Sequence, residues 1–223
     1  MGKDNDRGFK VITAFIKPGF RLRFSPTIIG AENIPKDGAV VIAGNHKNIS
    51  DQFLVFLATK RVVNYMAKRE YFDGALAPLF RWAGCIPVNR DGFDAAAVRS
   101  AIKILKKGGA VGIFPEGTRN KTDALLLPFK PGAVAIAQRG GAVIVPFAIT
   151  GEYERKGGLK IVFGKAFSPA DMSPEAATER SEICSPPGKS PEIEQKTTVL
   201  KNFLSFCIEF LFRAFFNLLW FFR

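Results

Sequence analysis

The chain has 223 residues, 47% of them hydrophobic, with 22 phenylalanines and a formal net charge of +12. This length suffices for one generous domain with its own core, and the charge points to nucleic acid, anionic lipid or anionic substrates as partners. The basic residues are spread along the chain, and no C-x-x-C pair or basic heptad region occurs. This distribution argues against nucleic acid and favours a membrane surface.

The three cysteines lie far apart in the sequence and predict neither a disulfide framework nor a metal cluster; they are Cys85, Cys184 and Cys207. The chain has one histidine, so no metal-ligand set is expected either. The first residues, MGKDNDRGF, lack the apolar run of a secretory signal, and Asp6 breaks the myristoylation pattern. We therefore expect a reducing, cytosol-facing location.

Residues 1–27 are expected to form an amphipathic segment that contacts the membrane. Between Gly8 and Phe24, one side of a helical wheel is apolar and the other is basic, which is typical of a helix lying in a membrane interface. The apolar side holds Phe9, Ile12, Ile16 and Phe20, and the basic side holds Lys10, Lys17 and Arg21. Pro18 is expected to kink or end this helix. An ordinary surface helix packed on the core is the alternative.

Residues 28–167 are expected to form the main domain, an α/β fold with a twisted, largely parallel or mixed sheet flanked by helices. Short apolar runs alternate there with helical patterns, as in chains that form such sheets. The predicted strands are Val40–Ala43, Val62–Met66, Cys85–Val88, Val111–Phe114, Val143–Ile149 and Lys160–Phe163. The predicted helices are Gln52–Thr59, Ala75–Trp82, Phe93–Lys106 and Gly132–Arg139, with Asp94 favouring the start of the third.

Beyond residue 167 the composition changes. Residues 168–202, rich in Pro, Ser, Glu and Lys, predict a weak helix followed by a polar connector. Residues 203–223 are apolar and about as long as a membrane span, interrupted by Glu209 and Arg213 at a spacing that allows an ion pair. This segment is expected to associate with the membrane as an atypical C-terminal helix. Spanning, lying in the interface and capping the core all remain open.

The stretch GNHKNISD follows the strand Val40–Ala43 directly, and its His46 is the one histidine of the chain. In open α/β sheets, ligands bind at the carboxyl ends of the strands. Ser50 is a natural N-cap for the next helix, so Asp51 falls in its first turn, from which the carboxylate can reach one imidazole nitrogen. The other nitrogen is then ready to take a proton from a hydroxyl. A helix-capping aspartate near a surface histidine is the alternative interpretation.

A second charged stretch, FPEGTR at residues 114–119, directly follows the apolar strand residues Val111–Ile113. Gly117 permits a tight turn with exposed backbone N–H groups, and the Arg119 guanidinium suits a phosphate. A plain turn with a surface arginine would look similar. Two charged loops at the carboxyl ends of strands in one sheet nevertheless favour a base beside an anion site.

Taken together, these stretches resemble the glycerolipid acyltransferase family, whose best-known members are 1-acyl-sn-glycerol-3-phosphate acyltransferases. NHKNISD is followed about seventy residues later by FPEGTR, and other blocks similar to those of the family arrive in its order. They are AKRE at residues 67–70, GCIPVNR at 84–90, LPFKPGA at 127–133 and VPF at 145–147. The resemblance covers residues 28 to 165. From Ser181 onward the sequence departs from the family's pattern.

The resemblance implies transfer of a fatty acyl group from a thioester to the sn-2 hydroxyl of lysophosphatidic acid, giving phosphatidic acid in phospholipid biosynthesis. His46 would be the general base and Asp51 would orient it. Arg119, helped by Lys68 and Arg90, would hold the phosphate. The other substrate-binding residues implied are Glu116, Gly117 and Thr118.

No cofactor is expected beyond acyl-CoA or acyl-ACP as co-substrate, and no acyl-enzyme, because Cys85 sits in an apolar run expected to fill core. The implied partners are membrane phospholipid or lysophospholipid and acyl-CoA or acyl carrier protein, and the implied location is the cytoplasmic face of the cell membrane, peripheral or monotopic. Glycerol-3-phosphate or another lysophospholipid as acceptor, a thioesterase, and a non-catalytic basic membrane-binding protein remain alternatives.

Overall fold

The computed structural model of the chain describes residues 3–75, 77–89, 92–122, 124, 126–155 and 157–183. Arg90, the polar connector beyond residue 183 and the apolar segment 203–223 lie outside these residues, so the expectations for them stay predictions. The predicted strands and the four predicted central helices all occur, each with bounds within two residues of those expected.

Seven strands of the described part form one sheet with the order β1-β7-β6-β2-β5-β3-β4. All neighbours are parallel except β6 and β7, so the largely parallel, mixed sheet is confirmed. The strands are β1 (Thr27–Ile29), β2 (Val40–Gly44), β3 (Val63–Lys68), β4 (Ile86–Val88), β5 (Ala110–Ile113), β6 (Val143–Thr150) and β7 (Lys160–Phe163). The sequence analysis missed β1, because this three-residue strand pairs only at the edge of the sheet and no residue in it is fully buried.

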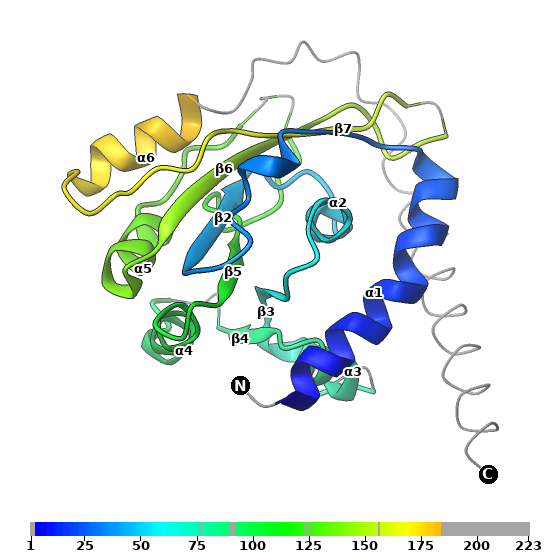
Figure 1. The fold of residues 1–223 in the computed structure, drawn as a ribbon, viewed down its shortest axis with the longest axis horizontal. Helices are drawn as coiled ribbons and strands as arrows, with labels where there is room; N and C mark the ends of the chain where they lie inside the picture. Colours follow the sequence, from blue (N-terminus) through cyan, green and yellow to red (C-terminus); the bar gives the residue numbers. More distant parts are fainter. Residues whose placement is uncertain are drawn as a thin grey trace. The chain divides into compact units, whose positions relative to one another are not determined.

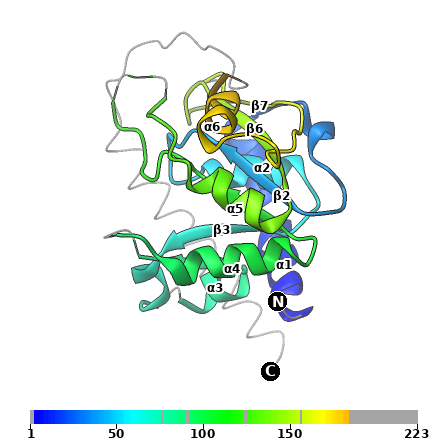
Figure 2. The same ribbon diagram turned by 90° about the vertical axis from the view of Figure 1, so that its left-hand side faces the viewer.

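Helices cover both faces of the sheet (Figures 1 and 2). One layer contains α1 (Lys3–Phe24), α2 (Asp51–Ala58) and α3 (Ala77–Trp82), and the other contains α4 (Ala95–Leu105), α5 (Gly132–Gly140) and α6 (Pro174–Ile183). The Asp94 carboxylate accepts the N–H groups of Ala96 and Ala97 at 3.0 and 2.9 Å, which confirms the predicted helix start. The α6 helix matches the weak helix predicted after residue 167.

The central strands are buried on both sides, which is why their sequences are continuously apolar rather than alternating. In β2, all of the residues from Val40 to Gly44 are buried, and the same holds for β5 from Ala110 to Ile113. A core on the α4 and α5 side includes Val41, Leu105 and Ile144, each at most 1% exposed. The sheet therefore forms a rigid base for the loops at the carboxyl ends of β2 and β5.

The N-terminal helix exists, but its predicted apolar side faces protein. Phe9, Ile12 and Phe20 are 3%, 8% and 4% exposed, and Phe9 packs edge-on against Phe56 of α2 with ring centroids 4.9 Å apart. The helix continues through Pro18 to Phe24, so of the two expectations for Pro18, a kink or an end, the end does not occur. The large apolar side chains that α1 exposes are instead Phe15 and Leu22, at 43% and 84%. Membrane contact stays a prediction, and these two side chains are its candidates.

Among the helices of the described residues, none combines the length and apolar character needed to cross a bilayer.

Gly44, the last residue of β2, has no room for a side chain. A Cβ atom there would lie 2.2 Å from the Phe147 carbonyl oxygen of the neighbouring β6. Gly44→Ala is therefore expected to lower the free energy of unfolding by about 1–3 kcal/mol through overpacking, measured by urea denaturation. Gly132→Ala is the control, because a Cβ at Gly132 meets no atom within 4 Å. Equal stability of the two variants would contradict this packing.

Candidate active site

The imidazole of His46 and the carboxylate of Asp51 form the predicted pair. His46 lies just past β2 and Asp51 begins α2, and Nδ1 of His46 lies 2.8 Å from Oδ2 of Asp51. Asp51 is fully buried, whereas the His46 side chain is 11% exposed. With Nδ1 bonded to a carboxylate, the Nδ1–H tautomer is favoured and Nε2 carries the lone pair. Asp51 thus orients the ring so that Nε2 can accept a proton.

Backbone and side-chain donors surround the buried Asp51 carboxylate. Oδ2 also accepts the N–H groups of Lys47 and Asn48 at 2.7 and 2.8 Å, and the Tyr153 hydroxyl donates to Oδ1. The turn before α2 therefore folds around this carboxylate. Ser50 occupies the N-cap position, but its side chain makes no capping bond, so the role expected for its hydroxyl was wrong; Asp51 binds the preceding amides instead.

Tyr153 is buried and donates as a neutral phenol. Burial, followed by the negative charge of Asp51, raises the pKa of Tyr153 well above its ordinary value. On its other side, the ring packs against Phe20 and Phe24 of α1, with centroids 6.3 and 5.7 Å away. The N-terminal helix thus supports the residue that holds Asp51.

The FPEGTR loop binds the main chain of His46 from both sides. The His46 N–H donates to Oε1 of Glu116 at 3.1 Å, and the Asn120 N–H donates to the His46 carbonyl at 2.7 Å. The Phe114 ring stacks on the imidazole with centroids 3.9 Å apart and planes inclined by 11°. The two charged stretches predicted from the sequence therefore form one site.

Glu116 is a second acidic group at the site, beside His46 and Asp51. It is 3% exposed, and its pKa is raised to about 7, mainly by burial and further by the charge of Asp51, while the bond from the His46 amide opposes the shift. Its Oε2 atom is buried without a hydrogen-bond partner in the described part of the chain. A buried polar atom without a partner is rare in folded proteins, which makes Glu116 a candidate functional group.

Two further contacts fix the loop after β2 to the end of β6. The Asn45 side chain accepts from the Ile149 N–H at 2.7 Å and donates to the Ile149 carbonyl at 2.9 Å. The Lys47 ammonium donates to the carbonyl of Gly151 at 2.8 Å and lies 3.3 Å from the carboxylate of Glu152. The backbone around His46 is therefore hydrogen-bonded to the loop after β5 on one side and to the end of β6 on the other.

The predicted phosphate-binding cations differ in their surroundings. Arg119 is half-buried and directly precedes Asn120, which binds His46. Gly117 adopts a positive φ of 72°, as its role in the turn requires, and with Thr118 it is exposed. Lys68 ends β3 at the same edge of the sheet, but its ammonium pairs with Glu70 at 2.7 Å.

Cys85 does not have the character of a nucleophile. Burial raises the pKa of its thiol to about 12, which keeps it protonated at neutral pH. It is half-buried just before β4, so it fills the core only in part. Within the described residues, no three His, Cys, Asp or Glu side chains are grouped to hold a metal ion.

The sequence analysis missed Tyr153, the stacking of Phe114 on His46, and the Asn45 clamp. Tyr153 lies 102 residues from Asp51, and only the order of strands in the sheet brings the end of β6 beside the end of β2. A signal was present, because Gly151–Tyr153 follows a predicted strand as the other two loops do. Asn45 and Phe114 lay within the quoted stretches but carried no predicted role.

On this largely parallel α/β sheet, a polar loop with a histidine oriented in this way can accept a proton from a bound group. Residues 25–150 match the family model described as Acyltransferase. A 1-acyl-sn-glycerol-3-phosphate acyltransferase of Bacillus subtilis is 33% identical over 179 residues, covering 77% of this chain and 88% of that protein. The chain belongs to the acyltransferase family.

Two other similar proteins agree with this. A 1-acyl-sn-glycerol-3-phosphate acyltransferase of Borreliella burgdorferi is 33% identical over 125 residues, which is 55% of this chain and 50% of that protein. The crystal structure of PlsC from Thermotoga maritima, a 1-acyl-sn-glycerophosphate (LPA) acyltransferase, superposes with a TM-score of 0.65. It is 26% identical, and the match covers 78% of this chain and 75% of that one.

Tyr153→Phe tests the support of Asp51. The variant keeps the ring contacts with α1 but leaves Oδ1 of a buried carboxylate without its donor. We expect the free energy of unfolding to fall by about 1–3 kcal/mol, measured by urea denaturation. Tyr71→Phe is the matched control, because Tyr71 is 41% exposed, and it should change stability by less than about 0.5 kcal/mol. Similar losses in both variants would contradict the bond.

Glu116→Gln tests the second buried acid of the site. Because the pKa of Glu116 is raised from 4.5 to about 7 in the folded chain, the folded state binds the proton more tightly. Relative to Glu116→Gln, the unaltered chain should lose stability as the pH rises from about 4.5 to 7, by at most about 3 kcal/mol, and lose no more above that range. Urea unfolding of both proteins at several pH values measures this; parallel stability curves would contradict it.

Proposed function

We propose that the chain transfers a fatty acyl group from a thioester to the sn-2 hydroxyl of 1-acyl-glycerol-3-phosphate, giving phosphatidic acid. The observation that carries the proposal is the 2.8 Å bond from Nδ1 of His46 to Asp51, which leaves Nε2 of a partly exposed imidazole as a base. The names of the relatives support the acceptor, since all three described above are acyltransferases of 1-acyl-glycerol-3-phosphate.

In the proposed mechanism, Nε2 of His46 takes the hydroxyl proton while the acceptor oxygen attacks the thioester carbonyl. The negative charge of Asp51 stabilises the imidazolium that forms, and the bonds to Lys47, Asn48 and Tyr153 keep the carboxylate in place. Collapse of the tetrahedral intermediate expels the thiolate, which takes the proton back from His46. Stacking against Phe114 holds the ring in one plane throughout.

Arg119 is the first choice for the phosphate of the acceptor, because it adjoins the loop bound to His46 and its guanidinium offers a fork of donors. Lys68 would join it by exchanging its Glu70 partner for the phosphate. Arg90 stays a prediction. The buried Glu116 would shape the pocket around the glycerol, while Gly117 and Thr118 form the exposed rim.

Because acceptor and product are lipids, we place the working protein at the cytoplasmic face of the membrane as a peripheral or monotopic protein. Phe15 and Leu22 of α1 are exposed apolar side chains that suit contact with lipid. Basic residues of the same helix, such as Lys10 and Arg21, favour an anionic surface. The donor is acyl-CoA or acyl-ACP, both of which present a thioester, and the mechanism needs no metal or other cofactor.

The test is acyl transfer to 1-acyl-glycerol-3-phosphate in detergent, with acyl-CoA and acyl-ACP offered separately. His46→Ala should lower kcat by about 10²- to 10⁴-fold, since it removes the general base. Lys106→Ala, an exposed residue after α4, is the control and should keep full activity. Chromatography measures the phosphatidic acid that each variant forms, and an unfolding curve checks that each variant is folded.

Three results would overturn the proposal. Release of free fatty acid without an acceptor would make the chain a thioesterase. If the chain transferred the acyl group preferentially to glycerol-3-phosphate or to another lysophospholipid, the proposed acceptor would be wrong. Undiminished lipid binding by His46→Ala, together with no turnover by the unaltered chain, would leave a non-catalytic membrane-binding protein.

A further inference from the structure

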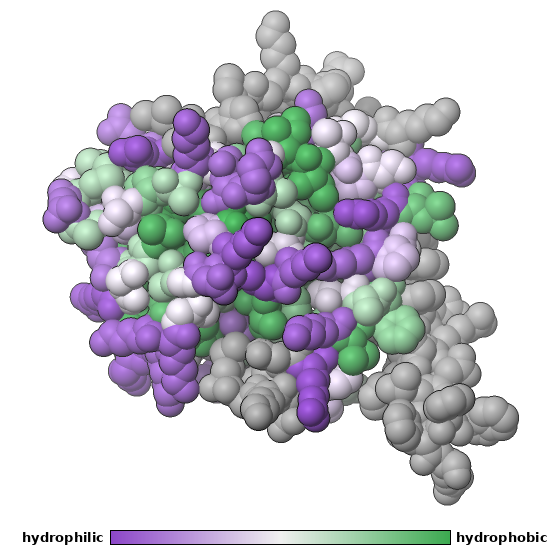
Figure 3. All heavy atoms as spheres, viewed as in Figure 1, coloured by the Kyte–Doolittle hydropathy of each residue, from purple (hydrophilic) through white to green (hydrophobic). Residues whose placement is uncertain are grey.

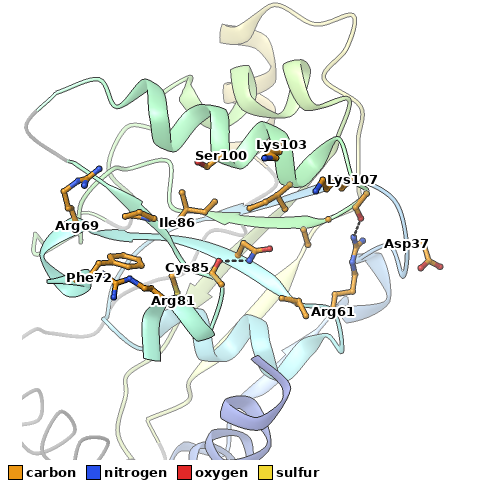
Figure 4. A pocket seen from close by; sticks show the side chains of 18 of the residues that line it. Asp37, Arg61, Arg69, Phe72, Arg81, Cys85, Ile86, Ser100, Lys103 and Lys107 are labelled. Atoms are coloured by element: carbon orange, nitrogen blue, oxygen red, sulfur yellow. Dashed lines mark hydrogen bonds between the residues drawn. The ribbon is translucent and has the colours of Figure 1, made fainter. Parts of the chain in front are cut away.

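A hollow of the described structure lies away from His46, along the outer edge of β3. Strand β4 pairs only with Met66, Ala67 and Lys68 of β3, so the earlier part of that edge carries no strand. The Asn64 side chain spans the gap and donates to the Gly84 carbonyl at 2.6 Å. Between this bare edge, α4 and the segment after α3 lies a groove of about 920 Å³, which we call the β3 groove (Figure 4).

The β3 groove is strongly basic. Six cationic side chains line it and only two carboxylates do, Asp37 and Asp73; the cations are Lys36, Arg61, Arg69, Arg81, Lys103 and Lys107. Figure 4 shows Lys103 and Lys107 along the α4 wall, with Arg69 and Arg61 toward opposite ends. In the space-filling view, hydrophilic side chains gather over α4 (Figure 3). An anionic ligand would be drawn into this concave surface.

Not all of these cations are available to a ligand. The Arg61 guanidinium donates to the carbonyls of Pro35, Gly38 and Gly108 at 2.6–2.8 Å, and Arg81 donates to Phe72 at 2.8 Å. Their contacts hold the ends of the groove in shape. Lys103 and Lys107, in contrast, are exposed and make no ion pair or hydrogen bond within the residues that the structure describes. Lys103 lies in the last turn of α4 and Lys107 lies two residues past its end, and both line the groove.

The walls of the β3 groove are also partly apolar. Phe72, Ile86, Pro87 and Ile104 line it between the charged groups. Its volume lies within the range of about 300–1,000 Å³ typical of small-molecule sites. A concave space with apolar walls and several cations suits a small molecule that joins a flat ring to phosphate groups. The convex surface of a partner protein fits the β3 groove less well than such a small molecule does.

One end of the β3 groove reaches the edge of the sheet that carries the candidate active site. Arg69 follows Lys68 at the carboxyl end of β3, and only β5 separates β3 from β2. With strands about 4.8 Å apart, the end of β3 lies about 10 Å across the sheet from the end of β2. From Val63 to Lys68 the strand extends about 17 Å away from that edge. A long molecule lying in the groove can therefore reach toward His46.

We propose that the β3 groove binds the phosphorylated adenosine end of coenzyme A, with the pantetheine arm leading past Arg69 toward His46. The phosphates contact Lys103 and Lys107, and the adenine ring lies against the apolar wall. This inference rests on the proposed function, because it selects acyl-CoA as a donor for that site. In this proposal, the affinity for acyl-CoA comes from the β3 groove rather than from the loops around His46.

The test measures binding of CoA without turnover, by titration calorimetry at low and high salt. Lys103→Glu/Lys107→Glu should weaken CoA binding on the order of tenfold, because two attractive charges become repulsive. Arg99→Glu/Lys106→Glu is the matched control, since it makes the same change of charge on exposed residues of α4 and its end that do not line the groove. The control should bind CoA within about twofold of the unaltered chain.

Two further probes identify what the groove recognises. Adenosine 3′,5′-bisphosphate should compete with CoA, and pantetheine, which lacks the phosphates, should bind equally to both variants. In the transfer assay, Lys103→Glu/Lys107→Glu should raise KM for acyl-CoA with kcat unchanged, as expected for a contact made equally in the ground and transition states.

Several outcomes would overturn the assignment. If both double variants weakened CoA binding equally, the binding would reflect general attraction to the basic surface. If the unaltered chain did not bind CoA, CoA would not be the ligand of the groove. A KM effect on acyl-ACP but not on acyl-CoA would assign the groove to a protein donor. CoA bound in the groove without transfer to 1-acyl-glycerol-3-phosphate would instead refute the proposed function alone, because the titration contains no acceptor.

Discussion

The buried carboxylate of Asp51 is the constraint on which the candidate site depends. A buried charge is costly unless it is fully hydrogen-bonded, and here the imidazole, two backbone amides and the Tyr153 hydroxyl supply the donors. Three of these four come from the turn between β2 and α2. The same bonds that satisfy the carboxylate therefore determine the path of the loop and the orientation of His46.

The second loop completes the site through the main chain rather than through catalytic side chains. Glu116 and Asn120 bind the N–H and the carbonyl of His46, so β5 cannot shift relative to β2 without moving the imidazole. The parallel register of these two strands, with Ala43 beside Ile113, brings the loops together. This arrangement places two acids near one histidine, and the resulting repulsion is part of why Glu116 holds its proton to about pH 7.

The sequence predicted the parts of the site that depend on local spacing. His46 and Asp51 are five residues apart, and the apolar runs before both charged loops predicted strands that end where the site lies. Contacts such as Tyr153 with Asp51 depend on the order β6-β2-β5, which no local pattern specifies. The packing of the apolar side of α1 against protein could not be predicted for a related reason. An amphipathic pattern predicts a helix with a buried side, but it does not distinguish burial in lipid from burial against α2.

The packing of α1 links a surface helix to the candidate pair His46 and Asp51. Phe20 and Phe24 contact the ring of Tyr153, and Tyr153 in turn binds Asp51, so one continuous set of contacts runs from the helix to His46. Leu22 lies in the same turn of α1 and is 84% exposed. A bilayer that receives Leu22 would therefore lie against α1, the helix that supports the proposed base through Tyr153. A lipid acceptor would then approach His46 from that side. The β3 groove lies instead at the edge of β3, between α4 and the segment after α3. The fold thus offers the proposed lipid acceptor and the proposed water-soluble donor separate approaches to one histidine.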